Sequence, residues 1–459
     1  MKKNVLSAAD RTRLLGTQSI GRLLIRLSGP AITGMLVQSM YNLVDTIFVG
    51  KGVGTLALAA LAVCLPIQIF LLAVSKTVGI GAASIISRLL GAGNEEEAGR
   101  IAGGSFVLVA FLGLGISLCG LIFLDPVLKL FGASSRILPY ARDYLSIIFI
   151  GGTFFSVTVC SNNIARSEGN ARVAMISMLV GAGTNIILDP IFIFALNMGI
   201  RGAAIATVTG QFFAFVWITR YFFTGRSHLK FDWKHLIPKL HQSLKIMQIG
   251  SSSFARIAGG SLMAIVVNNT IMHYGHEMHL AVLGVTNRML IFALMPLFGL
   301  VQGLQPVVGY NYGAGYFERV KKALKYALIS ATVLTGAYWL LFQLAPRFML
   351  GLFSNDENLI SSGAGILRIL VLMMPVVGFQ VIAAGTFQSL GKAGIAFILS
   401  ISRQILFLIP LALLLPLAIS PPLTGVWAAF PSADFLAACV TAIFFIRVMR
   451  NMRESALLV

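Results

Sequence analysis

The chain has 459 residues, of which 57% are hydrophobic and 11% are charged, and its formal net charge is +19. A soluble domain carries roughly 25% charged residues, so this composition, with a mean hydropathy of +0.87, excludes an ordinary soluble fold. The positive charge does not indicate nucleic-acid binding, because the chain has no soluble basic domain to do it.

Long apolar stretches recur along the whole chain, and each is about 20–25 residues long, enough for a helix to cross roughly 30 Å of hydrocarbon. The segments are expected to be helices, because each must satisfy its own backbone polar groups in lipid. The alternating segments of a membrane β-barrel are missing from the sequence. The predicted spans are residues 24–48, 55–78, 101–124, 140–163, 171–195, 200–222, 246–272, 280–308, 323–345, 364–387, 394–418 and 424–448.

The loops between these spans differ in charge. Lys and Arg, including Lys230, Arg319 and Arg403, are assigned to alternate loops, which is typical of the cytoplasmic side of a membrane. The longest polar connection, residues 223–245, belongs to this basic set, as do both chain ends. We therefore expect both termini and this loop to be cytoplasmic. The loop would separate an N-lobe, residues 1–222, from a C-lobe, residues 246–459.

The two halves repeat. Gly91-Ala92-Gly93 is followed 222 residues later by Gly313-Ala314-Gly315, and Ser167-Glu168-Gly169 is followed at the same offset by Ser389-Leu390-Gly391. Six spans in each half make this a parallel repeat, and transporters place their substrate sites between such halves. Channels repeat too, but this sequence has no loop that resembles a selectivity filter.

Ionisable residues inside spans are expensive and are therefore candidates for function. In the first span, Gln38, Tyr41, Asn42 and Asp45 share one helical face, which must point to the bundle interior or to a cavity. Pro30 lies in the same span and predicts either a static kink or a moving hinge.

A second carboxylate, Asp189, follows Asn185 by one helical turn, and Thr207 in the next span can add a hydroxyl oxygen. These groups can simply bond one another across helices. Two carboxylates in a low dielectric, however, need a proton or a cation between them. Asp434 stands alone after Pro431, where an interhelical hydrogen bond is favoured over a second cation site.

Signatures of catalysis are missing from the sequence. It contains no Gly-x-Ser-x-Gly, no nucleotide-binding lysine loop and no His-Glu-x-x-His. The cluster His273, His276, Glu277 and His279 is interpreted as a solvated loop rather than a metal site. We therefore expect no enzyme activity and no cofactor, and transport driven by an ion gradient.

Four motifs together resemble the MATE family, the multidrug and toxic compound extrusion transporters, most of all the bacterial MepA-like and DinF-like members. They occur in the family's order over essentially the whole chain. The motifs are Pro30 with Tyr41-Asn42-Leu43-Val44-Asp45, Ser87-Arg88-Leu89-Leu90-Gly91-Ala92-Gly93, Asn185-Ile186-Ile187-Leu188-Asp189-Pro190, and Gly202-Ala203-Ala204.

The resemblance implies an all-α membrane protein with twelve transmembrane helices in two six-helix lobes around a central cavity. It implies export of small amphipathic, often cationic compounds by a monomer in the bacterial inner membrane, in exchange for H⁺ or Na⁺. The family's cation site maps onto Asp45, Asn185, Asp189 and Thr207, which would be metal ligands only if Na⁺ is the coupling ion. Weaker candidates for the polar network or the substrate cavity are Gln38, Tyr41, Asn42, Tyr144 and Asn162.

Two expectations qualify this resemblance. Some family members carry acidic residues in the seventh helix, but this sequence has none between Ile246 and Met272. The alternative function is that of a related lipid-linked sugar or lipid flippase. Such flippases tend to have extra helices and a strongly cationic cavity.

Overall fold

The computed structural model describes residues 7–230, 236–353 and 356–457, and within these ranges the chain forms helices and no strand. Apolar runs form helices because the hydrogen bonds within a helix satisfy the backbone N–H and C=O groups without water. The first half contains α2 (Ile20–Gly52), α3 (Thr55–Gly91), α4 (Glu95–Ile122), α6 (Leu138–Ser167), α7 (Ala171–Pro190) with the π-helix η1 (Ile191–Ala195), and α8 (Gly199–Phe223). The second half contains α9 (Leu240–Tyr274), α10 (Glu277–Gly313), α11 (Phe317–Leu344), α13 (Glu357–Leu370), α14 (Met374–Ser389), α15 (Ala393–Ile401) with η3 (Ser402–Leu408) and α16 (Ile409–Ala418), and α17 (Pro422–Leu457).

In the described ranges, 11 helices are long and apolar enough to cross a membrane, and a broken helix brings the number to 12. The broken helix consists of α13 and α14, which meet at 50°. Pro375 lies in the first turn of α14, where its missing N–H costs no helix hydrogen bond. The prediction of an all-α protein with twelve spans is confirmed.

Three short helices complete the fold: α1 (Ala8–Thr17), α5 (Leu124–Leu130) and α12 (Pro346–Gly351). Of these, α1 was not predicted, because it is too polar to be found by a search for apolar spans. Several spans also extend beyond the predicted bounds: α3 continues to Gly91 rather than ending at residue 78. The next helix, α4, starts after Asn94, whose side chain accepts a hydrogen bond from the Glu97 N–H at 3.1 Å.

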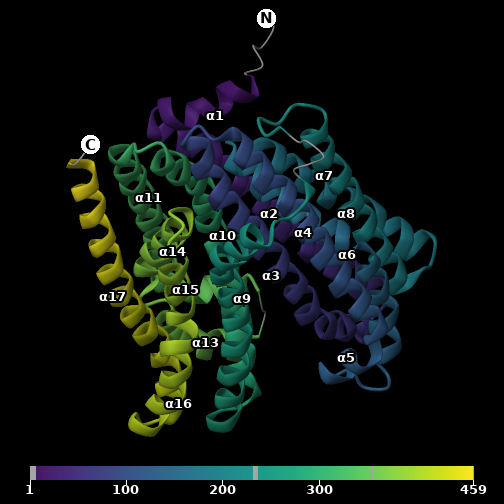
Figure 1. Ribbon diagram of the computed structural model, residues 1–459. Helices are drawn as coiled ribbons and strands as arrows, with labels where there is room; N and C mark the ends of the chain where they lie inside the picture. The colour runs from purple at the N-terminus through teal and green to yellow at the C-terminus, as the bar shows by residue number, and fades with distance from the viewer. Residues whose placement is uncertain (1–6, 231–235, 354–355, 458–459) are drawn as a thin grey trace, which may run out of the picture.

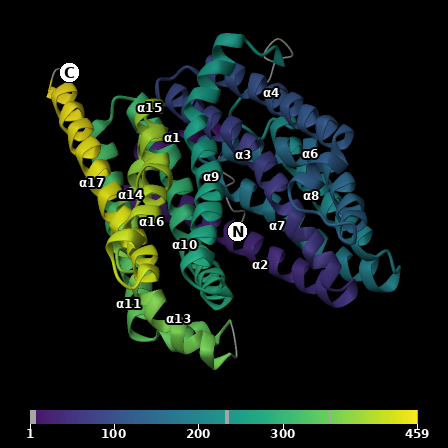
Figure 2. The same ribbon diagram turned by 90° about the horizontal axis from the view of Figure 1, so that it is seen from below.

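The helices form two groups (Figure 1). Helices α2 to α8 lie on one side and α9 to α17 on the other, and both chain ends lie at the same end of the molecule, which α1 crosses. The view from below shows the same two groups, with α3 and α9 side by side between them (Figure 2). We refer to the end that carries α1 and both termini as the terminal end.

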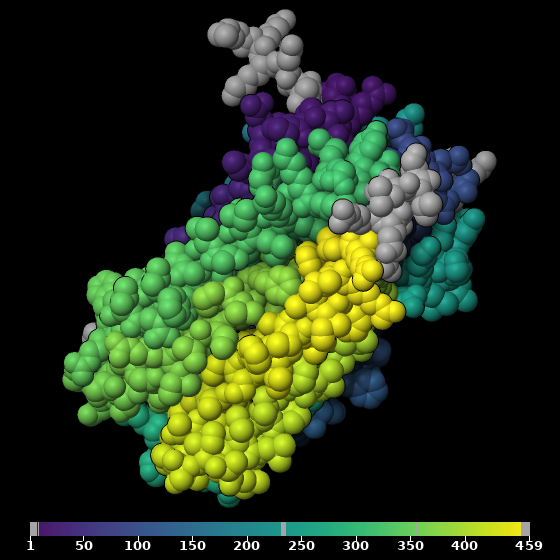
Figure 3. Space-filling view, turned by 90° about the vertical axis from the view of Figure 1, so that its left-hand side faces the viewer, coloured from purple at the N-terminus to yellow at the C-terminus, as the bar shows by residue number. Residues whose placement is uncertain are grey.

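The outer surface of the second lobe is apolar. Figure 3 shows α17 running along this face. Its Phe435, Ile443 and Ile446 are 53%, 65% and 66% exposed. Such large exposed side chains suit contact with lipid tails, which are as apolar as they are.

Glycines bring the two lobes into backbone contact at the terminal end. A Cβ atom added to Gly91 of α3 would lie 2.0 Å from the carbonyl oxygen of Tyr310 in α10. A Cβ added to Gly313 would likewise lie 2.0 Å from the carbonyl oxygen of Arg88. Gly313 is the repeat equivalent of Gly91, and Tyr310 is the repeat equivalent of Arg88, each 222 residues later. The sequence repeat is therefore also a repeat in packing.

The same device joins α3 to α9. A Cβ added to Gly250 would lie 1.8 Å from the Thr77 carbonyl oxygen, and one added to Gly81 would lie 2.1 Å from the Ile246 carbonyl oxygen. Only a residue without a side chain permits helices to approach so closely. The lobe interface near the terminal end is therefore closed by bare backbone.

Candidate functional site

Three helices of the first lobe bring the four predicted cation-site residues together. Asp45 comes from α2, Asn185 and Asp189 from α7, and Thr207 from α8. All four are buried, and Asp189 is 0% exposed. The helical spacing of Asn185 and Asp189 places both side chains on the face of α7 that meets α2 and α8.

Asn185 is the centre of the hydrogen bonds in this site. Its Nδ2 donates to Asp189 Oδ1 at 3.2 Å and to Thr207 Oγ1 at 3.1 Å. The carboxyl groups of Asp45 and Asp189 lie within hydrogen-bonding reach of one another. Two carboxylates in such contact inside a membrane repel unless a positive charge or a proton lies between them.

The site has more acceptors than donors. Asp45 Oδ1, Asn185 Oδ1 and Asp189 Oδ2 are buried and have no hydrogen-bond partner among the described residues. Buried polar atoms normally have partners, so three orphaned oxygens in one cluster need an explanation. A proton shared by the carboxyl groups, or a hard cation such as Na⁺ bound by oxygen ligands, fits this set of atoms.

The backbone of α7 changes at this site. Pro190 follows Asp189 and cannot donate to the helix ladder, and the π-helix η1 begins one residue later. On the other side of the site, Gly181 and Gly210 bring α7 and α8 close together: a Cβ on Gly210 would lie 2.5 Å from the Gly181 carbonyl oxygen. This close packing brings Thr207 within reach of Asn185.

The weaker candidates divide into near and distant residues. Tyr41 lies close to Thr207, and the buried Tyr144 lies near Asp45 and Gln68. The other three form no hydrogen bond with the cation site within the described chain: Gln38, Asn42 and Asn162.

The distant candidates differ in burial and position. Gln38 is half-buried and Asn42 is exposed. Asn162 is buried on α6, but it follows Tyr144 by about 27 Å of helix. Its Oδ1 has no partner within the described chain. The structure therefore does not bring Asn162 to the cation site.

In the second lobe, Asp434 is not alone. The Arg403 guanidinium, from η3, forms an ion pair with the Asp434 carboxylate. The prediction that Arg403 belongs to a basic loop is wrong, because Arg403 lies within the eleventh span. The Asp434 carbonyl oxygen also accepts a hydrogen bond from Gln380 Nε2 at 2.6 Å. The carboxylate is thus neutralised by a partner in its own lobe.

Pro30, the predicted hinge, lies inside α2, which is helical on both sides of it. His276 and His279 form a reciprocal cap at the start of α10. No group of three or more His, Cys, Asp or Glu side chains that could hold a metal ion occurs in the part of the chain that the structure describes.

A buried carboxylate that was not predicted to be functional lies at the terminal end. Glu168, just after α6, accepts hydrogen bonds from the Tyr221 hydroxyl at 2.6 Å, the Ser227 hydroxyl at 2.9 Å and the His228 N–H at 2.8 Å. Burial raises the pKa of Glu168. This residue fastens the start of the inter-lobe loop to the first lobe. The sequence repeat could have singled out Glu168. The equivalent position in the second half is Leu390, so the carboxylate occurs in one half only.

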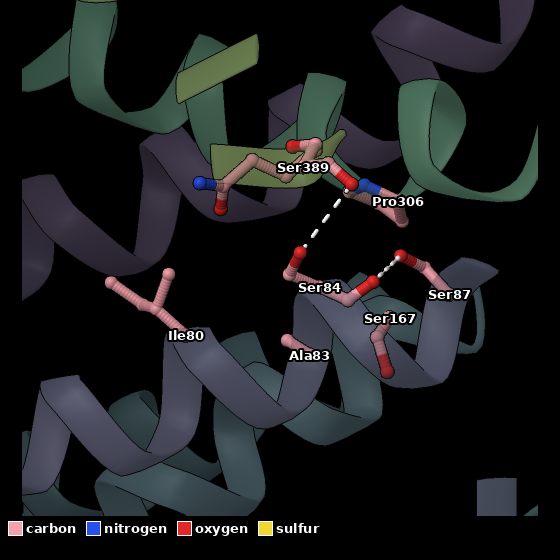
Figure 4. Close-up of a pocket in the computed structure, with 8 residues that line it drawn as sticks. Ile80, Ala83, Ser84, Ser87, Ser167, Pro306 and Ser389 are labelled. Atoms are coloured by element: carbon pink, nitrogen blue, oxygen red, sulfur yellow. Dashed lines mark hydrogen bonds between the residues drawn. The ribbon is translucent and has the colours of Figure 1, made fainter. Parts of the chain in front are cut away.

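A small pocket lies between the lobes near the terminal end (Figure 4). Hydroxyl groups line it, and the Ser84 hydroxyl donates to the carbonyl oxygens of Gln388 at 2.6 Å and Ser389 at 3.4 Å. Gln388 Nε2 in turn donates to the hydroxyls of Ser252 and Ser253 at 2.8 and 2.9 Å. These bonds connect α3 of the first lobe with α9 and α14 of the second, so they tie the lobes together at the pocket.

Comparisons with protein families and with individual proteins point to the same family of transporters. The MatE family profile matches residues 30–191 and 255–414. The multidrug export protein MepA of Staphylococcus haemolyticus is 28% identical over 433 residues, which are 94% of each chain.

Solved structures share the fold. A MATE crystal structure in the bent conformation superposes with a TM-score of 0.92 at 26% identity, covering 97% of this chain and 99% of the other. The MATE multidrug transporter DinF-BH gives a TM-score of 0.87 at 40% identity, covering 94% of this chain and 96% of the other.

Proposed function

Because the chain belongs to the MATE family of multidrug efflux transporters, we propose that it is an antiporter that exports small amphipathic compounds in exchange for H⁺ or Na⁺. It would act as a monomer in the bacterial cytoplasmic membrane. The observation that carries the proposal is the cluster of Asp45, Asn185 and Asp189, with its three orphaned buried oxygens.

The cluster can couple two movements. A proton or Na⁺ that enters the site removes the repulsion between Asp45 and Asp189, and α2 can then pack differently against α7. Unloading restores the repulsion. Exchange follows if cation and substrate favour different arrangements of the lobes, because a ligand shifts an equilibrium only by its differential affinity.

The two coupling ions would use the site differently. A proton needs only the two carboxyl groups, one of which would donate to the other. Na⁺ needs more oxygen ligands, and Asn185 Oδ1 and Thr207 Oγ1 are the additional oxygens within the cluster.

Reconstitution into proteoliposomes tests the proposal. With substrate loaded inside, an imposed pH gradient or Na⁺ gradient should accelerate efflux, and the gradient that does so identifies the coupling ion. Counterflow of labelled substrate against an opposing cation gradient separates an antiporter from a channel, which only dissipates gradients. Efflux that neither gradient changes would contradict the proposed function.

A further inference from the structure

A second charged cluster occupies the interface between the lobes. Lys76 of α3 lies near Arg256 of α9 and Arg166 of α6, close enough for their like charges to repel. Lys76 and Arg256 are only partly buried. Three helices from two lobes therefore direct positive charge to one region inside the membrane.

This cluster has no carboxylate to balance it among the described residues. Within the described spans the buried carboxylates are Asp45, Asp189 and Asp434, and Asp434 is paired with Arg403. None of the ion pairs in the described ranges includes Lys76, Arg166 or Arg256. Arg166 donates to the Asn163 side chain at 3.0 Å, and Arg256 lies over the Phe298 ring, 5.7 Å from its centre.

The cluster lies where the lobes face one another. Lys76 is adjacent to Thr77, the residue that touches Gly250 of α9. Phe70 of α3 and Phe254 of α9 meet edge to face at 6.1 Å across the same interface. The cluster thus combines positive charge with aromatic rings from both lobes.

The small pocket of Figure 4 adjoins this cluster. Its lining residues Ile80, Ala83 and Ser84 lie one to two turns from Lys76 on the same face of α3. Arg166 precedes Ser167, another lining residue. The interface therefore continues from the charged cluster into a pocket lined by hydroxyl groups.

Unpaired cations inside a membrane are expensive, and they persist where they line a polar path or bind a partner. The chemistry that satisfies an ammonium and a guanidinium together is an oxyanion, which accepts charge-assisted hydrogen bonds from both. We propose that Lys76 and Arg256 bind an oxyanion group, such as a carboxylate, sulfonate or phosphate, on the exported amphipathic compound. The proposal rests on the proposed function and specifies the class of its substrate.

The oxyanion site is separate from the cation site. Asp45 lies near the end of α2 that is far from α1, whereas Lys76 lies about 15 Å closer to the terminal end. Cation and substrate therefore need not compete for the same side chains. This reverses the charge that the resemblance implied for the substrate.

A pair of dyes with the same ring system and opposite charge tests the assignment. Fluorescein carries a carboxylate, whereas rhodamine 6G is a cationic ester, and fluorescence anisotropy measures the binding of each to the purified protein. Lys76→Gln and Arg256→Gln should each weaken fluorescein binding by about tenfold or more, because each removes a charged partner. Rhodamine 6G binding should be unchanged or stronger.

Two further variants serve as controls. Lys129→Gln removes an exposed positive charge on α5 and should leave both affinities unchanged. Arg256→Lys keeps the charge and should retain most of the fluorescein affinity, which separates loss of charge from loss of folding. Equal fluorescein affinity in the wild type and both glutamine variants would overturn the proposal.

Lipid is the other source of an oxyanion. Short-chain phosphatidylglycerol that displaces fluorescein, and binds more tightly than it, would keep the oxyanion site but assign it to a lipid headgroup, as in the flippase alternative. The binding measurements need no gradient. The charge assignment can therefore fail while gradient-driven efflux succeeds, and the reverse.

Discussion

Asp45 and Asp189 are the residues on which the proposed coupling rests, and each has one buried oxygen without a hydrogen-bond partner in the described chain. Replacing either by Asn keeps the size of the side chain and removes the negative charge. The change also places an N–H₂ group where the wild type can hold a cation or a proton.

Asp45→Asn and Asp189→Asn should each abolish gradient-driven export, because the site can no longer switch between a charged and a neutral state. Efflux from proteoliposomes should fall to the level of liposomes without protein, while the melting temperature is maintained. Asp143→Asn is a matched control: this carboxylate pairs with Arg201 at 2.7 Å, outside the cation site. Wild-type export by both site variants would refute the coupling assignment.

Asp434→Asn should behave in the opposite way, with export retained and stability lowered. The substitution leaves the Arg403 guanidinium without its partner, which costs about 1–3 kcal/mol for a charged group that is only partly buried. Thermal unfolding in detergent measures the loss. Adding Arg403→Gln should recover part of it, because the unpaired charge is then removed. Loss of coupling with unchanged stability would instead indicate a second cation site.

At the residue scale, the sequence predicted which polar groups of the first lobe gather and missed two other clusters. Asn185 and Asp189 lie on one helix, so spacing alone predicts that they face the same way. The Asp434–Arg403 pair joins two helices, and no local pattern reveals such a contact. Lys76 and Arg256 come from different lobes, and only the packing of α3 on α9 shows that the two positive charges lie in one region.

At the scale of the helices, the close crossings depend on glycine. Gly250→Val should push α9 away from the Thr77 carbonyl oxygen, since a Cβ atom would lie 1.8 Å from it. Overpacking of this kind costs about 1–3 kcal/mol. The variant should therefore melt at a lower temperature than the wild type.

Separation of the helices should also open the terminal end. In a background without the native cysteines, a cysteine replacing Ile80 beside the crossing should react faster with a maleimide in the Gly250→Val variant. Gly183→Ala is the control, because a Cβ there would meet nothing within 4 Å. Equal reactivity in all three proteins would show that the crossing does not close the interface.

Helix positions were predicted well, and helix ends less well, for a physical reason. Hydropathy reports where lipid surrounds the chain, but helices continue into water when caps and packing support them. Thus α3 extends to Gly91 because it packs against α10, and α1 forms although no part of it is apolar enough to span. The break between α13 and α14 lies in apolar sequence, where hydropathy gives no sign of a bend and only Pro375 marks the start of a new helix.

At the scale of the whole molecule, the orientation in the membrane is still a prediction from charge. A single cysteine at Lys230 should react with an impermeant maleimide only after the cells are opened, because the inter-lobe loop is expected in the cytoplasm. A cysteine at Lys129, near the opposite end of the first lobe, is the matched control and should react in intact cells. Labelling of position 230 from outside would invert the topology.

The division of the chain at residues 223–245 is likewise a prediction. Its expected role as a connection agrees with the contacts of its first residues, since Ser227 and His228 are held by Glu168. His228 Nε2 also lies 3.0 Å from a carboxylate oxygen of Glu95. Residues 231–235, including Lys234, lie outside the described residues.

The paired glycine contacts at Gly91 and Gly313 form a possible pivot point between the two lobes at the terminal end. Backbone atoms have no rotamers to rearrange, so a rocking of the lobes about this point would disturb no side chain at the two glycines themselves. The arm is long: α3 has 37 residues, which span about 55 Å. A rotation of about 10° at the terminal end would therefore swing the far end of α3 by about 10 Å. Residues at the opposite mouth of the transporter would therefore move several times as far as residues beside the paired glycines.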